Sequence, residues 1–287
     1  MKKILVTGAN GQLGRELQTL AASYPAFDFF FAGRDLLAVD DPQQIADIFS
    51  LHQPAWIINC AAYTAVDRAE TDKDAAFRIN GDGPGYLAAA CRDSGARLIH
   101  LSTDYVFPGD SDIPLKETDA TGPINIYGAS KLAGEQQALA QHPQGTLIIR
   151  TSWVYSQYGS NFVKTMIRLM TERPAINVVE DQIGSPTYAA DLAAAILHIL
   201  AGGHFLPGIY HYSNEGRISW YQFALAIRED IGSTCTVNPI PTSGFPTPAR
   251  RPHYSLLDKS LIRNTFQVAI PDWRPGLASC IAQLHDK

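Results

Sequence analysis

The sequence has few cysteines, and they show no pattern that would indicate a metal or disulfide framework. The cysteines among the 287 residues are Cys60, Cys91, Cys235 and Cys280. Their positions are not paired in spacing, so neither a set of disulfides nor a zinc site is expected. We expect buried, reduced thiols.

Long apolar and basic runs are also missing. The first apolar run covers only residues 4–6, too short for the core of a signal peptide, and no stretch of about 18 apolar residues occurs. The formal net charge of −5 argues against a broad nucleic-acid-binding face. We therefore expect a cytoplasmic protein with a small-molecule partner and with neither a nucleic acid nor a membrane as partner.

A glycine-rich turn follows the first predicted strand. Residues 3–7 are typical of a buried parallel strand and residues 16–20 of a helix. Glycines between them permit a tight turn and a close approach of backbone to a pyrophosphate, and the helix amino terminus offers free N–H groups. The spacing differs from the G-x-G-x-x-G pattern, so a structural turn in another α/β protein is the alternative. The predicted dinucleotide contacts in this turn are Gly8, Asn10, Gly11, Gln12, Leu13 and Gly14.

The next predicted strand, residues 27–32, ends where a dinucleotide-binding fold contacts the adenosine ribose. Arg34 follows it and could bind a 2′-phosphate through two parallel hydrogen bonds, which favours NADPH. The other interpretation is that Arg34 is a solvated loop residue. Asp35 beside it weakens the preference for NADPH over NADH. We expect NADPH as the cofactor, with NADH also accepted.

Two further predicted strands bring small and polar residues to the same sheet edge. Strand 56–60 ends in Ala61 and Ala62, whose small side chains leave room for a cofactor, with Tyr63 and Thr64 beside the nicotinamide half. The strand that ends near Ser102 is followed by three polar residues. They are Thr103, a candidate ligand of a carbonyl oxygen, and Asp104 and Tyr105, candidates for substrate contact.

Tyr127 and Lys131 lie four residues apart on a predicted helix and therefore on one face. A neighbouring ammonium is expected to lower the pKa of the phenol, which can then protonate a carbonyl oxygen as hydride arrives at the carbon. A tyrosine at a helix edge beside a solvated lysine is the alternative, and the glycine turn and Thr103 argue against it. We expect Tyr127, Lys131 and Thr103 to be the catalytic residues.

With these motifs in this order, the chain resembles the extended short-chain dehydrogenase/reductase superfamily. Residues 102–107, 125–128 and 150–155 narrow the resemblance to the dTDP-4-dehydrorhamnose reductase family, over nearly the whole chain. The resemblance implies that NADPH or NADH reduces a nucleotide-linked 4-keto-6-deoxy sugar to dTDP-L-rhamnose for cell-surface polysaccharide. It also implies that Tyr127 donates the proton, that Lys131 contacts the ribose, and that Asp104 and Trp153 hold the sugar.

Two departures from the family pattern affect the expected ligands. Ala38 and Val39 stand where many relatives have an acidic residue near the adenosine, so the contact there must come from backbone, such as that of Val39, or from Asp40. Some members form a magnesium-bridged dimer through glutamates. Glu16 matches the first of these, but the second falls on Ala190, beside Asp191. We expect no metal, and either a monomer or a homodimer.

The second half of the chain offers further substrate contacts. The indole of Trp153 could cover the apolar face of a pyranose, or it could pack at a hinge between lobes. Arg250 and Arg251, held among prolines, suit a diphosphate, although a surface loop whose arginines pair with nearby acids is the alternative.

These patterns predict an α/β protein with a Rossmann-type, doubly wound parallel sheet. We expect an NAD(P)-binding domain over residues 1–150 and, over residues 151–287, a small α/β substrate-binding lobe that can return strands to the main sheet.

Two other functions fit parts of the pattern. A nucleotide-sugar epimerase or dehydratase of the same superfamily is one, although the dehydratases carry a glutamate where Tyr105 stands here. A non-catalytic regulatory subunit, similar to that of methionine adenosyltransferase, is the other.

Overall fold

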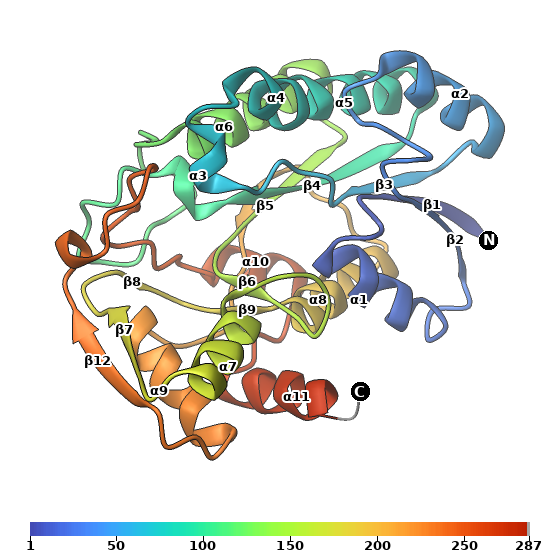
Figure 1. The fold of residues 1–287 in the computed structure, drawn as a ribbon. Helices are drawn as coiled ribbons and strands as arrows, with labels where there is room; N and C mark the ends of the chain where they lie inside the picture. The colour runs from blue at the N-terminus through green and yellow to red at the C-terminus, as the bar shows by residue number, and fades with distance from the viewer. Residues whose placement is uncertain (286–287) are drawn as a thin grey trace.

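Six parallel strands form the central sheet of the computed structural model, which describes residues 1–285. The strands are β1 (Lys2–Thr7), β2 (Phe27–Ala32), β3 (Trp56–Asn59), β4 (Arg97–Thr103), β5 (Thr146–Thr151) and β10 (Gly208–His211). Their order across the sheet is β2-β1-β3-β4-β5-β10 (Figure 1). Each neighbouring pair is parallel. The predicted Rossmann-type sheet is confirmed.

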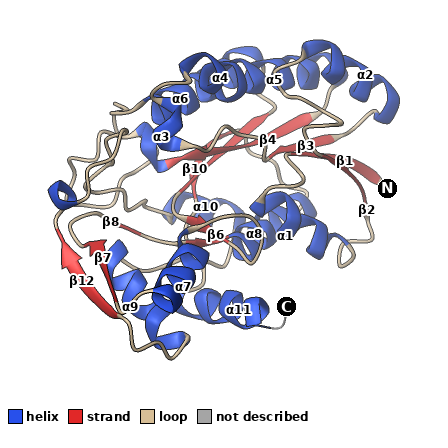
Figure 2. Ribbon diagram, in the orientation of Figure 1, coloured by secondary structure: helices blue, strands red, loops and turns tan. Residues whose placement is uncertain are grey.

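Helices cover both faces of this sheet (Figures 1 and 2). One face carries α2 (Pro42–His52), α3 (Val66–Ala69), α4 (Lys73–Phe77), a π-helical turn (Arg78–Asp82), α5 (Gly83–Ser94) and α6 (Ile126–Gln141). The other face carries α1 (Gln12–Ala21), α8 (Ala189–Ala201) and α10 (Ser260–Phe266). None of the helices in residues 1–285 combines the length and apolar character that a membrane span requires.

The strands have apolar side chains on both sides because both faces are covered. Along β1, Ile4 and Val6 point into the core beneath α1 and α8, whereas Leu5 points into the core beneath α2 and α5. Ile57 and Ile58 divide in the same way in β3. The period of two along a strand thus produces two separate cores from one continuous apolar run.

The second half of the chain contributes to two parts of the molecule. It returns β10, α8 and α10 to the main sheet, and it forms a smaller lobe, drawn below that sheet in Figure 1. The lobe contains β6 (Val154–Tyr155), α7 (Phe162–Glu172), β7 (Ala175–Val179), β8 (Ile183–Gly184), β9 (Thr187–Tyr188), β11 (Ile218–Ser219), α9 (Trp220–Asp230), β12 (Thr236–Ile240) and α11 (Trp273–His285).

The lobe has its own apolar core, to which Val163, Met166, Phe223 and Ile227 belong. Its β7 and β12 pair in parallel across a long sequence separation. Local sequence patterns did not predict these two strands, nor α10 and α11, because their pairing and packing partners are distant in the chain.

The chain reverses its direction of strand addition at β1, which lies between β2 and β3. In open α/β sheets, ligands bind at such a switch point, beyond the carboxyl ends of the strands. Gly8 leaves β1 there with φ of +63°, and a Cβ atom on it would lie 2.6 Å from the backbone nitrogen of Ala61, which follows β3. Only glycine allows the two chain segments to meet this closely.

Helix α6 also approaches its neighbours through glycine. A Cβ atom at Gly134 would overlap the carbonyl oxygen of Asn80 in the π-helical turn and would lie 3.1 Å from Pro84 Cγ in α5. Gly81 also packs against α6, but a Cβ atom there would fit, since it would lie 3.5 Å from Ala133 Cβ, an ordinary van der Waals distance. The close packing of α6 against this face therefore depends on the missing side chain at Gly134.

We expect Gly134→Ala to destabilise the protein by about 1–3 kcal/mol, because the added methyl group must displace backbone. Gly81→Ala is the matched control, and we expect it to change the free energy of unfolding by less than about 1 kcal/mol. Urea unfolding followed by circular dichroism measures both. Equal midpoints for the two variants would contradict this account of the contact.

Candidate active site

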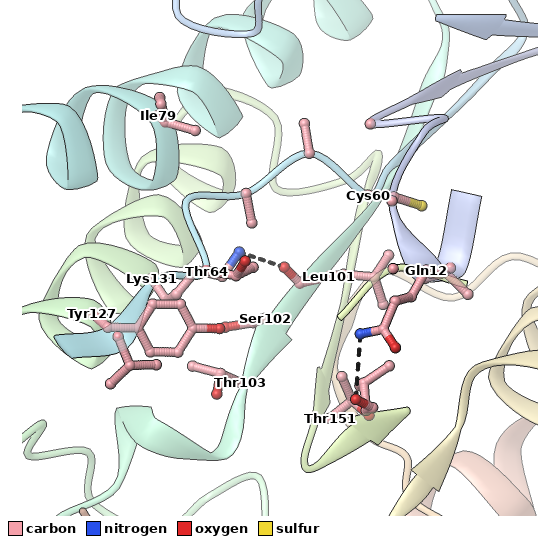
Figure 3. A pocket seen from close by; sticks show the side chains of 18 of the residues that line it. Gln12, Cys60, Thr64, Ile79, Leu101, Ser102, Thr103, Tyr127, Lys131 and Thr151 are labelled. Atoms are coloured by element: carbon pink, nitrogen blue, oxygen red, sulfur yellow. Dashed lines mark hydrogen bonds between the residues drawn. The ribbon is translucent and has the colours of Figure 1, made fainter. Parts of the chain in front are cut away.

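A cavity of about 880 Å³ opens at the carboxyl edge of the sheet, over the switch point. Its walls come from the turns after β1, β3, β4 and β5 and from helix α6. The predicted site residues that line it are Gly8, Asn10, Gly11, Gln12, Leu13, Arg34, Val39, Ala61, Ala62, Thr64, Thr103, Asp104, Tyr105, Tyr127, Lys131 and Trp153. Figure 3 shows Tyr127 and Lys131 on one side and Gln12 and Cys60 on the other.

The glycine turn presents the amino terminus of α1 to the cavity. Gly11 precedes α1 and provides no side-chain cap, and no acidic residue lies in the first turn. The first N–H groups of the helix and its positive dipole end are thus available to an anion. Gly14 does not line the cavity. A Cβ on it would come within 2.7 Å of Ala9 Cα, so Gly14 serves the packing of α1 on the turn.

Arg34, Val39 and Asp40, which were expected near the adenosine, line one part of the cavity. Arg34 is exposed, whereas Asp40 accepts a hydrogen bond of 2.6 Å from Nε of Arg78. An exposed guanidinium beside a carboxylate that already has a partner suits a cofactor with an additional phosphate.

Tyr63 was predicted to contact the cofactor, but it does not line the cavity. Its hydroxyl donates to Asp72 Oδ2 at 3.0 Å, and its backbone N–H donates to Asn80 Oδ1 at 2.8 Å. Ala62 and Thr64 on either side do line the cavity. The side chain of Tyr63 therefore ties the loop to the residue before α4, and its backbone ties the loop to the π-helical turn.

Helix α6 presents Tyr127 and Lys131 to the cavity from its first two turns. Asn125 caps the helix, since its Oδ1 accepts from the N–H of Gly128 at 2.7 Å. Lys131 is buried, and its Nζ donates to the carbonyl oxygen of Leu101 in β4 at 2.6 Å. In Figure 3 the ring of Tyr127 extends toward Ser102 and Thr103 of the same strand. The three predicted catalytic side chains thus meet at one wall.

The pKa of Tyr127 moves in the direction opposite to the one expected from the sequence. Burial raises it to about 12, Thr103 lowers it by hydrogen bonding and the charge of Asp104 raises it. Burial also lowers the pKa of Lys131 to about 8, which weakens the ammonium as a source of positive charge. The phenol is therefore protonated at neutral pH and available as a proton donor.

Asp104 is a buried carboxyl group next to Thr103. Thr103 Oγ1 donates to Asp104 Oδ1 at 2.9 Å, while Oδ2 has no hydrogen-bond partner among the described residues. Burial raises its pKa to about 6, while the neighbouring hydroxyl groups of Ser255 and Thr103 act to lower it. Asp104 lines the cavity, and a carboxyl oxygen there can accept a hydrogen bond from a hydroxyl group of a ligand.

Trp153 lines the cavity beside a second tryptophan, Trp220. Its backbone φ is +48°, a left-handed value that is rare for such a bulky residue. Its indole stacks on that of Trp220, with ring centroids 3.6 Å apart and planes inclined by 12°. Both indoles line the cavity. Trp220 begins α9, far away in sequence, and no local motif marks it.

Arg250 and Arg251 are not brought to the cavity wall. Arg251 forms two hydrogen bonds with Asp67 in α3, of 3.1 and 2.8 Å. The side chain of Arg250 is exposed, and its carbonyl oxygen accepts from Asn125 Nδ2 at 2.7 Å. The alternative interpretation, a loop whose arginines pair with acids, describes Arg251. The loop supports the start of α6 and does not line the cavity with its guanidinium groups.

The residues present fit a nicotinamide dinucleotide. An uncapped helix terminus, a glycine turn packed on Ala61 and an exposed Arg34 occur around one cavity. Residues 1–285 contain no group of three or more His, Cys, Asp or Glu side chains that could hold a metal ion. Glu16, the residue considered for magnesium, accepts a hydrogen bond of 2.6 Å from the Ser156 hydroxyl.

Comparisons with known proteins agree with this geometry. The family model described as the RmlD substrate binding domain matches residues 1–286. A dTDP-4-dehydrorhamnose reductase of Burkholderia thailandensis is 42% identical over 298 aligned positions, which cover 98% of this chain and 99% of that protein.

Two solved structures are similar over almost the full length. A dTDP-4-dehydrorhamnose reductase of Clostridium acetobutylicum has a TM-score of 0.94 and 39% identity, and the match covers 99% of both chains. That of Bacillus anthracis, solved in complex with NADP, has a TM-score of 0.93 and 43% identity, and the match covers 99% of this chain and 100% of that one.

The raised pKa of Asp104 has a consequence for stability that can be measured. Between its ordinary value of 3.8 and about 6, the folded state binds more protons at this site than the unfolded state, so the carboxyl group lowers stability as pH rises through this range. The free energy of unfolding of Asp104→Asn minus that of the wild type should therefore increase by up to about 3 kcal/mol when the pH rises from 4 to 7.

Asp110→Asn, at an exposed loop position, is the control, and its difference from the wild type should be nearly constant over the same range. Urea titrations at both pH values give the comparison. A pH-independent difference for Asp104→Asn would show that this carboxyl group titrates normally.

Proposed function

The chain belongs to the family of the RmlD substrate binding domain, and from this membership we propose that it is a reductase that uses NADPH to reduce the 4-keto group of dTDP-4-dehydrorhamnose. The observation that carries the proposal is the convergence of Tyr127, Lys131 and Thr103 on a cavity whose opposite wall is the glycine turn. The product would be dTDP-L-rhamnose, a precursor of cell-surface polysaccharide. A cytoplasmic location and a monomer or homodimer remain predictions.

Different residues would bind different parts of the cofactor and the sugar. The N–H groups at the start of α1 would hold the pyrophosphate, Arg34 the 2′-phosphate, and Ala61, Ala62 and Thr64 the nicotinamide half. When bound, the reduced nicotinamide supplies the hydride. The carboxyl group of Asp104 would accept a hydrogen bond from a sugar hydroxyl, and Trp153 would offer an apolar face to the ring.

The proton comes from Tyr127. Its phenol is protonated at neutral pH and would transfer the proton to the oxygen of the keto group as negative charge develops there. Thr103 would stabilise the same oxygen, and its hydroxyl must then turn away from Asp104, to which it donates at 2.9 Å. The phenolate left on Tyr127 would be stabilised by the ammonium of Lys131, four residues later on the same helix face.

An epimerase or dehydratase would retain its dinucleotide and recycle it within one reaction. A regulatory subunit would consume none without its partner. Stoichiometric oxidation of NADPH by the isolated protein, with dTDP-rhamnose as the identified product, distinguishes the proposed reaction from both. Retention of tightly bound NAD without net consumption would favour the epimerase or dehydratase.

We expect Tyr127→Phe to lower turnover by about 10²-fold or more, because the phenyl ring cannot supply the proton. The assay follows NADPH oxidation with dTDP-4-dehydrorhamnose, and a fluorescence titration checks that NADPH still binds. Tyr86→Phe, at an exposed position in α5, is the control and should retain full activity. Full activity of the Tyr127 variant would refute its role as proton donor.

We expect Arg34→Ala to lower kcat/KM for NADPH by about 10- to 100-fold and to change that for NADH by less than about threefold. The reason is that only NADPH carries the 2′-phosphate that the guanidinium would bind. Arg15→Ala, on the exposed side of α1, removes the same charge without altering the cavity lining and should affect both cofactors equally little. Equal losses with both cofactors in the Arg34 variant would contradict the assignment.

A further inference from the structure

A third side chain follows Tyr127 and Lys131 along the same face of α6. Glu135 lies one helical turn beyond Lys131 and is 1% exposed. It does not line the cavity, so it contacts neither of the proposed ligands directly. A fully buried carboxylate in this position needs partners, since an unpaired buried charge is strongly unfavourable.

Those partners come from the two strands that form the cavity edge. Arg150 in β5 donates from Nε to Oε1 at 2.9 Å and from Nη2 to Oε2 at 2.7 Å, and Ser102 in β4 donates to Oε1. Arg150 is itself 2% exposed and lies over the ring of Phe107. Glu135 is therefore held as a charged carboxylate in a defined orientation.

Lys131 lies four residues before Glu135 and therefore on the same face of α6. Burial disfavours its charged form, while Glu135 is the strongest of the charges that favour it. The other titratable groups around Lys131 are Cys60 after β3 and His100 in β4. Burial raises the pKa of the Cys60 thiol and lowers that of His100, so both are uncharged at neutral pH.

The other charged or titratable groups near this part of α6 are neutral, are paired, or influence Tyr127 and not Lys131. The phenol of Tyr127 is protonated, and the charge of Asp104 raises the pKa of Tyr127. The guanidinium of Arg150 forms an ion pair with Glu135 itself. His211 in β10, near Arg150, has its pKa lowered to about 3 and is neutral. Glu135 thus remains as the negative charge that acts on Lys131 at neutral pH.

We infer that Glu135 is a positioning residue for the reduction. Held by Arg150 and Ser102, its carboxylate keeps Lys131 charged and fixes the rotation of α6 that presents Tyr127 to the cavity. The inference rests on the proposed function, in which the ammonium of Lys131 stabilises the phenolate that proton transfer leaves behind. Without Glu135, a neutral lysine would stand beside that phenolate over more of the working pH range.

The first test measures the charge on Lys131 in the protein without ligands. In a sample labelled with 13C-lysine, the Cε resonance of Lys131 is assigned by its loss in Lys131→Met and followed from pH 6 to pH 11. In the wild type we expect its midpoint near 8. In Glu135→Gln the midpoint should fall by roughly half a unit or more, because the amide keeps the shape but loses the charge. An unchanged midpoint would overturn the inference.

The second test measures kcat/KM for NADPH oxidation against pH. The alkaline limb of the Glu135→Gln profile should move to lower pH, with a loss of roughly three- to tenfold at pH 8.5 and a smaller loss at pH 6.5. A role in structure alone would lower activity equally at all pH values, and that result would refute the positioning role. Glu135→Asp keeps the charge and should restore much of the wild-type profile.

The controls separate folding, position and function. Glu172→Gln removes a carboxylate from the exposed pair with Arg168 in α7 and should leave both measurements unchanged. If Glu135→Gln fails to fold because Arg150 is left unpaired, the double variant Glu135→Gln with Arg150→Gln is compared with Arg150→Gln alone. These two variants differ only in the Glu135 carboxylate, so the Lys131 midpoint should be lower in the double variant, and equal midpoints would overturn the inference. A wild type that shows the coupling but oxidises no NADPH would count against the proposed function, not against the link between Glu135 and Lys131.

Discussion

The buried ion pair between Glu135 and Arg150 is the contact on which the geometry of the site depends. It joins α6 to β5, and Ser102 extends it to β4, so one carboxylate links the helix that carries the proton donor to both strands at the cavity edge. Loss of one member of such a pair typically costs about 3–5 kcal/mol. Lys131 adds a parallel link through its hydrogen bond to Leu101.

Burial acts on the two principal titratable groups in complementary ways. It raises the pKa of Tyr127 and lowers that of Lys131, because each group is disfavoured in its charged form. A protonated phenol and a lysine near its titration point are suited to a reduction, in which the phenol must give up a proton and the charge left behind must be stabilised. Glu135 opposes the effect of burial on the lysine.

Local sequence predicted much of this site because several of its parts are short-range. A strand, a glycine turn and a helix are adjacent in the chain, and a tyrosine and a lysine four residues apart share a helix face whatever surrounds them. The same reasoning failed where a side chain had two possible partners. Arg251 suited a diphosphate by chemistry, yet Asp67, far away in sequence, takes its guanidinium. Tyr63 lies in the expected loop, but its hydroxyl bonds Asp72.

Periodicity and short spacings in the sequence encode the parallel sheet, the glycine turn over the switch point and the identity of the candidate proton donor. The tertiary structure alone decided which groups meet across long separations: Trp220 stacked on Trp153, and Arg150 paired with Glu135. It also decided the protonation state of the donor, because the pKa of Tyr127 follows from how deeply the folded chain buries the phenol and not from the spacing to Lys131.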